Sequence, residues 1–332
     1  MENKHFRYHK IIVESIEILQ LNLDNITVLT EVASGLFLYT PIIAALAGAK
    51  RVYGVVNDSI YGKAEDIIKE CLNIARFLNI DISLFEFSKN NVPVTFLQNA
   101  DIVTNSGHLR PLNEEKLKYL KPCAAIPIMY EKWELRTNDI DVAFCKKNNI
   151  TIAGTWENHP DLQIFDFCKH LMLKIIFEAG YEIKENNIII FSSDHYGVLL
   201  KAGCEELGAN NILVSTNIEE ITSFMPKADF IFFCDYNNLK VLLDNTSASM
   251  FNLKEIKKLN KSLGIIHLAG AIDMQYVNDE GFHLYPNKNG YVQKMTQTLA
   301  YLGPKPLLLL QTAGLKVGQE LFTNTISNLS QI

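Results

Sequence analysis

The stretch from Asn186 to Asn217 constrains the fold of this chain more than any other. It begins with an apolar run typical of a buried strand, passes through a short polar turn, and continues as a helix that ends at Gly208 before a second strand. A strand, a tight turn, a helix and a second strand in this order form the first half of a nucleotide-binding crevice. The stretch therefore predicts a nucleotide-type α/β domain in this part of the chain.

The turn between the strand and the helix keeps only part of the dinucleotide-binding pattern. That pattern is G-x-G-x-x-G, and here its positions are Ser192, Ser193, Asp194, His195, Tyr196 and Gly197. Only the last glycine remains, and Asp194 adds a negative charge where a phosphate would lie. Asp194 is equally suited to cap the helix, and His195 either offsets its charge or is an exposed turn residue, so both interpretations stay open.

The residues that would hold the rest of a dinucleotide are also altered. An acid that binds the ribose hydroxyls is expected at the end of the second strand, about twenty residues after the turn. That place holds Ser215, Thr216 and Asn217, whose polar groups leave both NAD and NADP possible. We expect a cofactor to contact the six turn residues, Thr216, and Asp235 at the end of a later strand.

The whole chain shows the same alternation of strands and helices. At 332 residues it is too long for one ordinary core, and this alternation implies parallel sheets covered on both faces. We predict an α/β protein of two Rossmann-like domains with an interdomain cleft. A helix from Pro160 to Ala179 would bridge them, and a last strand at Leu307 to Leu310 would precede a final helix. The first domain would comprise residues 1–157 with 313–332, and the second residues 158–312.

Composition narrows the partners. The net charge of −6 argues against nucleic acid, because a phosphate backbone requires a basic face. The longest apolar run, Phe37 to Ala49, is too short and too mixed to span a membrane. Six scattered cysteines without a C-x-x-C pair favour buried free thiols in a reducing cytoplasm, and no cluster has metal-ligand spacing. We expect a cytoplasmic protein that binds a small molecule without a metal, with a homodimer as the expected assembly.

Three local sequences resemble the D-isomer-specific 2-hydroxyacid dehydrogenases and their relatives. They are the loop from Ala100 to Leu112, the run from Asn138 to Thr155, and the segment from Leu310 to Gly318 with its Ala313-Gly314 pair. The resemblance implies a substrate domain interrupted by an inserted NAD domain, with the final helix returning to the first domain. It also implies an NAD(P)-dependent oxidoreductase that acts on a small carboxylate-bearing metabolite.

The family's catalytic positions are occupied differently here. The resemblance places Gln311 where the family has its catalytic histidine, and an amide cannot act as a general acid or base. It places His267-Leu-Ala-Gly in the region where the family's catalytic arginine follows a strand. If such a reaction occurs, a histidine must move the proton instead, so the candidate catalytic set is His108, His267 and Gln311.

Polar residues at the ends of predicted strands form the candidate substrate site. Asn105, Ser106, Gly107 and His108 directly follow a strand, where ligand loops lie in open α/β sheets. Arg110 can bind a carboxylate through two parallel hydrogen bonds, although the loop also fits a plain polar turn. We expect the substrate to contact Glu31, Asn105, Ser106, Gly107, Arg110, Tyr130 and Glu131.

A second interpretation starts earlier in the chain. Glu31-Val-Ala-Ser-Gly-Leu-Phe after the first strand, with Asn57-Asp58-Ser59 after the next, is similar to the nucleotide loop of S-adenosylmethionine-type methyltransferases. A glycine lets the backbone approach a ligand, and an acid binds ribose hydroxyls. The alternative to a dehydrogenase is thus a non-redox protein of the same fold that binds an S-adenosylmethionine-type nucleoside, or one that has lost cofactor use. It also remains open that Glu31 and Asp58 merely face the carboxyl edge of the sheet.

Overall fold

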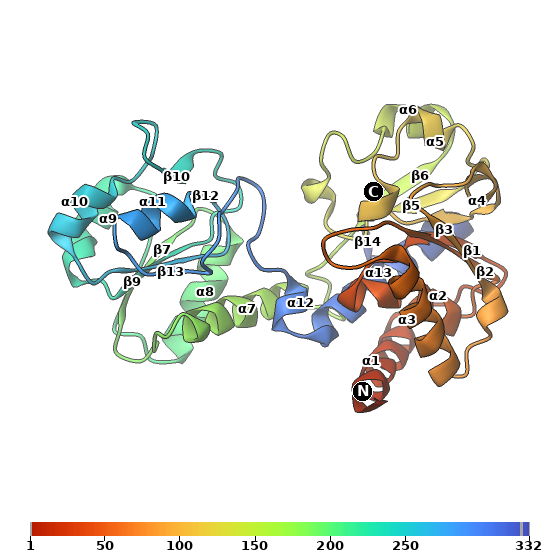
Figure 1. Cartoon of the computed structure of the whole chain (residues 1–332), viewed down its shortest axis with the longest axis horizontal. Coiled ribbons are helices and arrows are strands. Elements are labelled where there is room, and N and C mark those ends of the chain that lie inside the picture. The colour runs from red at the N-terminus through yellow and green to blue at the C-terminus, as the bar shows by residue number, and fades with distance from the viewer. Residues whose placement is uncertain (1, 326–327, 332) are drawn as a thin grey trace. The chain divides into compact units, whose positions relative to one another are not determined.

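The computed structural model describes residues 2–325 and 328–331. The chain folds into two compact units: unit 1 comprises Met1–Ile164 with Gly303–Ile332, and unit 2 comprises Phe165–Leu302 (Figure 1). The boundaries expected from the sequence are 157/158 and 312/313. Both differ from the boundaries of the two units, which lie at 164/165 and 302/303. The second differs because Pro304–Thr323 is one continuous helix, which a boundary at 312/313 would divide.

Within the described residues, unit 1 contains a seven-stranded sheet of order β14-β6-β5-β4-β1-β2-β3. Only β14 runs antiparallel to its neighbour. The chain builds one half of the sheet outward from β1 to β3 and then returns to the other side of β1 with β4. The strands are β1 (Thr27–Glu31), β2 (Arg51–Val56), β3 (Phe85–Lys89), β4 (Ile102–Val103), β5 (Ala125–Pro127), β6 (Thr151–Thr155) and β14 (Ser330–Gln331).

Helices cover both faces of this sheet. Because side chains alternate along a strand, Val28 and Ile102 enter the core under α1, α2, α3 and α13, whereas Leu29 and Val103 enter the core under α4, α5 and α6. The helices and 3-10 turns of unit 1 are α1 (Glu2–Leu19), η1 (Gly35–Leu38), α2 (Tyr39–Leu46), α3 (Ala64–Phe77), η2 (Ile82–Leu84), α4 (Val94–Asn99), η3 (Gly107–Leu109), α5 (Glu114–Leu117), η4 (Lys132–Glu134), α6 (Val142–Lys147) and α13 (Pro304–Thr323).

The predicted strand at Leu307–Leu310 is wrong, because these residues form part of α13. A short apolar run is compatible with a buried strand or a buried helix, and here the run is buried because α13 packs on β4, β5 and β6 and also contacts α1 and α2. Gly318 allows this close packing on the sheet, since a Cβ at that position would lie 2.8 Å from Ile102 Cγ2. Gly314 has the same role against Met129.

Unit 2, every residue of which is described, contains a five-stranded parallel sheet of order β13-β11-β9-β7-β8. The chain runs outward from β7 to β8 and then returns to the other side of β7 with β9. A separate pair, β10 and β12, lies outside this sheet. The strands are β7 (Asn187–Phe191), β8 (Asn211–Val214), β9 (Phe230–Phe233), β10 (Val241–Leu243), β11 (Gly264–His267), β12 (Ala271–Ile272) and β13 (Leu284–Tyr285).

The sheet of unit 2 is also buried on both faces. Ile188, Ile190 and Phe232 pack with residues of α7 and α8, whereas Ile189 and Phe233 pack with residues of α9, α10 and α11. The strands therefore read as continuous apolar runs, as parallel strands covered on both faces do. The helices and turn of unit 2 are α7 (Ile164–Glu178, its first residue in unit 1), α8 (His195–Glu206), α9 (Ile218–Phe224), η5 (Met225–Lys227), α10 (Leu253–Leu259), α11 (Met274–Asp279) and α12 (Leu299–Leu302).

The cysteines match the expectation of buried free thiols. All six are free, and all except Cys123 are buried. Burial raises the pKa of the thiols of Cys71, Cys145 and Cys204 to about 12, which keeps them from forming reactive thiolates at neutral pH. In the described part of the chain, no helix has the length and apolar character needed to cross a membrane.

The contact between Gly318 and the sheet gives a test of the packing of α13. Gly318→Ala and Gly318→Val should lower the free energy of unfolding progressively, because each added group must displace Ile102 or Pro127. We expect a loss of about 1–3 kcal/mol for the valine variant, measured by urea denaturation. Equal stability of the two variants and the wild type would contradict close packing of α13 on β4 and β5.

Candidate functional site

Each unit has one place where ligand-binding loops are expected. In open parallel sheets, ligands bind at the carboxyl ends of the strands, where the strand order reverses. That place lies between β1 and β4 in unit 1 and between β7 and β9 in unit 2. Most predicted substrate residues fall at the first position, and most predicted cofactor residues fall at the second.

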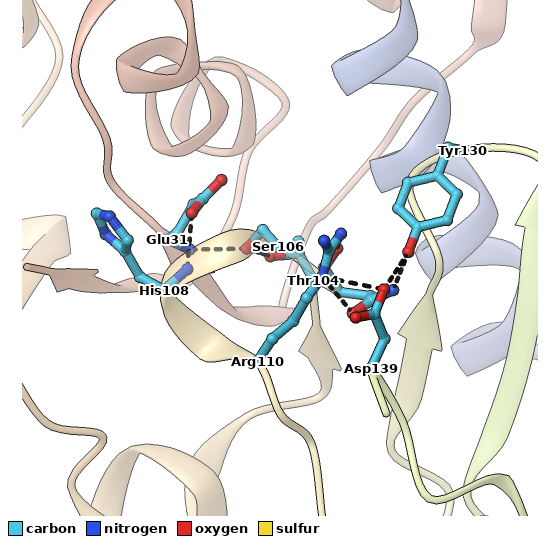
Figure 2. A network of polar contacts seen from close by, with 8 residues as sticks. Glu31, Thr104, Ser106, His108, Arg110, Tyr130 and Asp139 are labelled. Carbon is cyan, nitrogen blue, oxygen red and sulfur yellow. Dashed lines mark hydrogen bonds and ion pairs between the residues drawn. The ribbon is translucent and has the colours of Figure 1, made fainter. Parts of the chain in front are cut away.

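In unit 1, the end of β1 is tied to the loop after β4. Glu31 is 8% exposed, and its Oε2 accepts a hydrogen bond of 2.9 Å from the backbone amide of His108 (Figure 2). The amide of Glu31 donates to Ser106 Oγ at 3.3 Å, and Thr104 joins Ser106 to Thr30. A Cβ on Gly107 would lie 3.0 Å from Glu31 Oε2, so the loop requires a small residue there. Glu31, Ser106, Gly107 and His108 are therefore brought together as the sequence predicts.

The imidazole of His108 lies at this site in a defined orientation. Its Nδ1 is 3.4 Å from the carbonyl oxygen of Val55, at the end of the neighbouring strand β2. A carbonyl oxygen only accepts hydrogen bonds, so this contact makes Nδ1 the donor and leaves Nε2 as the basic nitrogen. The side chain is half-buried. His108 is thus the one member of the predicted catalytic set that lies at the carboxyl edge of the first sheet.

Arg110 and Tyr130 form a second, connected part of the network. Arg110 Nε donates to Asn105 Oδ1 at 3.0 Å, and a terminal nitrogen of the guanidinium donates to the Asn105 carbonyl at 2.9 Å. Asn105 Nδ2 donates to the Tyr130 hydroxyl, which donates to Asp139 Oδ2 at 2.8 Å. Arg110 also lies 3.6 Å from Asp139 (Figure 2). Much of the guanidinium is therefore engaged within the protein, and Asp139 is a partner that the sequence analysis did not include.

The other two predicted catalytic residues are both buried. Gln311 lies within α13, is 8% exposed, and accepts a hydrogen bond of 2.7 Å from Thr40 Oγ1. His267 belongs to unit 2 and is fully buried, and its Nε2 donates to the Pro286 carbonyl at 2.9 Å. Burial lowers the pKa of His267 to about 4. Both side chains therefore have a hydrogen-bond partner within the protein.

The turn after β1 is the more open of the two nucleotide-type turns. Ser34 precedes η1 and makes no capping hydrogen bond. Gly35 has a φ of +70°, is exposed, and has no atom within 4 Å of the position that a Cβ would occupy. Asp58 lies two residues beyond β2, where its Oδ1 accepts from the amide of Ala64 at 2.8 Å and its side chain is half exposed. The backbone of this turn is thus accessible, with carboxylates at the ends of both adjacent strands.

Glu131 belongs to a separate cluster of carboxyl groups. Its Oε1 accepts from the amide of Glu157 at 2.8 Å, and both residues are less than 9% exposed. Burial, with the charge of Glu131, raises the pKa of Glu134 to about 7. Burial, with the charges of Glu134 and Glu131, raises the pKa of Glu157 well above its usual value. The carboxyl groups of this cluster therefore hold protons near neutral pH. In the described residues, no three His, Cys, Asp or Glu side chains are arranged to hold a metal ion.

In unit 2, the turn after β7 is filled by its own side chains. Asp194 is the N-cap of α8, since its Oδ1 accepts from the Tyr196 amide at 3.0 Å. Its Oδ2 accepts from the Tyr236 amide at 2.8 Å, across the sheet at the end of β9. Asp235 Oδ2 accepts from both the amide and the hydroxyl of Ser193, at 3.0 and 2.8 Å. Ser192 Oγ accepts from the amides of Asp194 and Gly197, at 3.3 and 3.2 Å.

This geometry does not fit the pyrophosphate of a nicotinamide dinucleotide. A pyrophosphate at a helix N-terminus needs the amides of the turn as donors, and these amides already have side-chain acceptors. Two carboxylates also lie where negative charge would have to bind. At the end of β8, Ser215 Oγ donates to Glu220, and neither Ser215 nor the half-buried Thr216 is an acid that could hold ribose hydroxyls. Gly197, the one glycine kept from the dinucleotide-binding pattern, is needed for packing, because a Cβ at this position would lie 2.7 Å from the Cβ of Ser192.

The remaining cofactor prediction, His195, stacks on the ring of Phe165 with a centroid distance of 4.5 Å. Burial lowers its pKa, so it offers no positive charge with which to offset Asp194 at neutral pH. A crevice of about 530 Å³ in unit 1 lies between β6, α6 and α13. None of the predicted site residues lines it, so the predicted sites and the crevice are separate.

Comparison with known proteins identifies the fold and no more than the fold. No protein-family model matches the chain, and no curated protein matches its sequence. A dipicolinate synthase subunit from Bacillus halodurans has a similar structure, with 13% identity and a TM-score of 0.55 over 92% of this chain and 99% of that chain.

Two other solved structures match less well. A transhydrogenase from Sinorhizobium meliloti has 8% identity and a TM-score of 0.42, covering 91% of this chain and 96% of its own. A D-isomer-specific 2-hydroxyacid dehydrogenase family protein from Aeromonas salmonicida has 9% identity and a TM-score of 0.41, covering 86% of this chain and 99% of its own. The predicted two-domain Rossmann-type fold is confirmed by the first of the three similarities.

The carboxyl cluster predicts a pH dependence of stability. The folded state raises the pKa of Glu134 from 4.5 to about 7, so its contribution is fully present below pH 4.5 and is lost as the pH rises through 7. Glu134→Gln should flatten the fall in unfolding free energy between these values, as measured by urea denaturation at several pH values. The exposed Glu182→Gln is the control. An unchanged slope for Glu134→Gln would contradict proton uptake by this cluster.

Proposed function

We propose that this protein binds a small nucleoside-bearing metabolite in unit 1, at the carboxyl edge between β2, β1 and β4. The observation that carries the proposal is the contrast between the two turns. The turn after β1 leaves Gly35 open and Ser34 without a capping bond, whereas the turn after β7 is filled by Asp194 and Asp235. S-adenosylmethionine is the first ligand to test, because it carries a ribose and no pyrophosphate.

The residues at this edge offer groups for such a ligand. Glu31 uses Oε2 to hold the loop after β4, and its second oxygen can accept a hydrogen bond from an ammonium or hydroxyl group. Asp58 is exposed at the end of the adjacent strand, where an acid can bind ribose hydroxyls. The backbone amide of His108 binds Glu31, and the His108 imidazole offers Nε2 as the acceptor nitrogen, which is suited to take a proton from a bound substrate.

Thermal-shift measurements test this assignment. S-adenosylmethionine should raise the melting temperature of the wild type, because a ligand that binds only the folded state stabilises it. Glu31→Gln should weaken binding by about tenfold, through loss of a charge-assisted hydrogen bond. Glu86→Gln, an exposed residue on β3 of the same sheet, is the matched control. A shift that Glu31→Gln leaves intact, or no shift with any adenosyl ligand, would reject the assignment.

A second candidate is an NAD(P)-dependent oxidoreductase that acts on a small carboxylate-bearing metabolite. It is favoured by the fold that this chain shares with the dipicolinate synthase chain and by the placement of His108 and Arg110 in one loop. The cofactor would have to bind without the usual pyrophosphate contacts at the β7 turn. The same screen with NAD, NADP and their reduced forms distinguishes this candidate from the first.

The oxidoreductase candidate predicts no ordinary 2-oxo acid reduction. Gln311, in α13, cannot titrate, and its side chain is hydrogen-bonded to Thr40 of α2. His267 is fully buried in unit 2. Pyruvate or glyoxylate with NADH should therefore give negligible oxidation of NADH, followed by the absorbance of the reduced cofactor. His108→Ala is the companion variant. Brisk turnover, undiminished in that variant, would show that the proton carrier lies elsewhere.

A further inference from the structure

The turn after β7 contains a cradle of backbone amides, each of which donates a hydrogen bond to a side chain of the protein. Six backbone amides converge on it, from the ends of β7 and β9 and the start of α8. Three side chains accept from all of them: Ser192 Oγ, the carboxylate of Asp194 and the carboxylate of Asp235. The six amides are those of Ser193, Asp194, Tyr196, Gly197, Tyr236 and Asn237.

The two carboxylates occupy this cradle from opposite sides. Asp194 follows β7 and reaches across to the Tyr236 amide, and Asp235 follows β9 and reaches back to Ser193. Each carboxylate therefore links the two strand ends that border the switch point. Two adjacent anionic groups, held by amides of the turn, of the first turn of α8 and of the loop after β9, have the chemistry of a diphosphate at such a turn. Hydrogen bonds from amides to carboxylates are also among the stronger ones in proteins.

We propose that Asp194 and Asp235 are a built-in substitute for a nucleotide diphosphate, so that unit 2 keeps its dinucleotide-type fold without binding a dinucleotide at this turn. The pair satisfies the amides that a diphosphate would satisfy and repels any phosphate that approaches them. The hydrogen-bond donors of the cradle in unit 2 are then already satisfied without a bound diphosphate. Gly197 is retained for packing against Ser192 and not for access by a ligand.

The proposal predicts that an anion can replace the missing carboxylates. Asp194→Gly/Asp235→Ser removes both acceptors and leaves several amides without partners, which lowers the melting temperature. Inorganic pyrophosphate should restore much of that loss, and its affinity should be at least about tenfold higher than for the wild type. Sodium chloride at equal ionic strength should not restore it. Hydrogen exchange of residues 192–197, followed by mass spectrometry, locates the bound anion.

Asp229→Ala provides a matched control in the same sheet. Asp229 Oδ2 accepts from the Asn187 amide at 2.6 Å, at the opposite end of β7. Its removal also leaves an amide without an acceptor, but outside the cradle, so pyrophosphate should not rescue this variant. Asp194→Asn/Asp235→Asn keeps the shapes and removes the charges. This variant should also bind pyrophosphate more tightly than the wild type, and it provides the test if the glycine–serine variant does not fold.

Two results would overturn the proposal. One is a failure of both double variants to gain pyrophosphate binding over the wild type. The other is tight binding of NADH to the wild type with protection of residues 192–197 from exchange. Neither result depends on a ligand at the β1 turn, because Glu31→Gln can be combined with each measurement and leaves unit 2 unchanged. The proposal and the assignment of a nucleoside site in unit 1 therefore stand or fall separately.

Discussion

Backbone amides at the carboxyl edge of a parallel sheet need hydrogen-bond acceptors. In this protein, polar side chains at the carboxyl edges of both sheets provide such acceptors. Unit 2 meets it from within, through Ser192, Asp194 and Asp235. In unit 1, Glu31 accepts from the loop after β4, while the turn around Gly35 stays accessible. Both sheets reverse their strand order at these places, so one architecture presents a filled edge and an open one.

Several of these features can be predicted from the sequence because they depend on local order. The alternation of apolar runs and turns predicts both sheets, and the polar residues that directly follow strands predict where the two edges lie. The helix start after β7 leaves two roles open for Asp194, a cap or a charge at a phosphate position. In the structure one oxygen of the carboxylate caps α8, and the other accepts a hydrogen bond from the Tyr236 amide.

Other features depend on contacts between distant residues, and the sequence does not contain them in a readable form. The pairing of Ser193 with Asp235 joins residues 42 positions apart. Glu134 and Glu157 become proton-holding groups only because two loops bury them beside Glu131. The segment at Gln311 keeps an Ala-Gly pair that resembles a catalytic motif, but in the fold its glycine, Gly314, lets α13 pack closely against Met129. Small residues needed for packing and small residues needed for catalysis give the same sequence signal.

The place of α13 in the first sheet also affects how the chain can fold during synthesis. The face of unit 1 that α13 covers is formed by strands completed by residue 155, yet the helix that covers it begins at Pro304. All of unit 2, Phe165–Leu302, is synthesised between these two events. On the ribosome, unit 2 can complete its own core while the apolar surface of β4 and β5 still waits for its cover. The apolar residues of these strands that α13 covers therefore stay exposed until the last helix of the sheet has been synthesised.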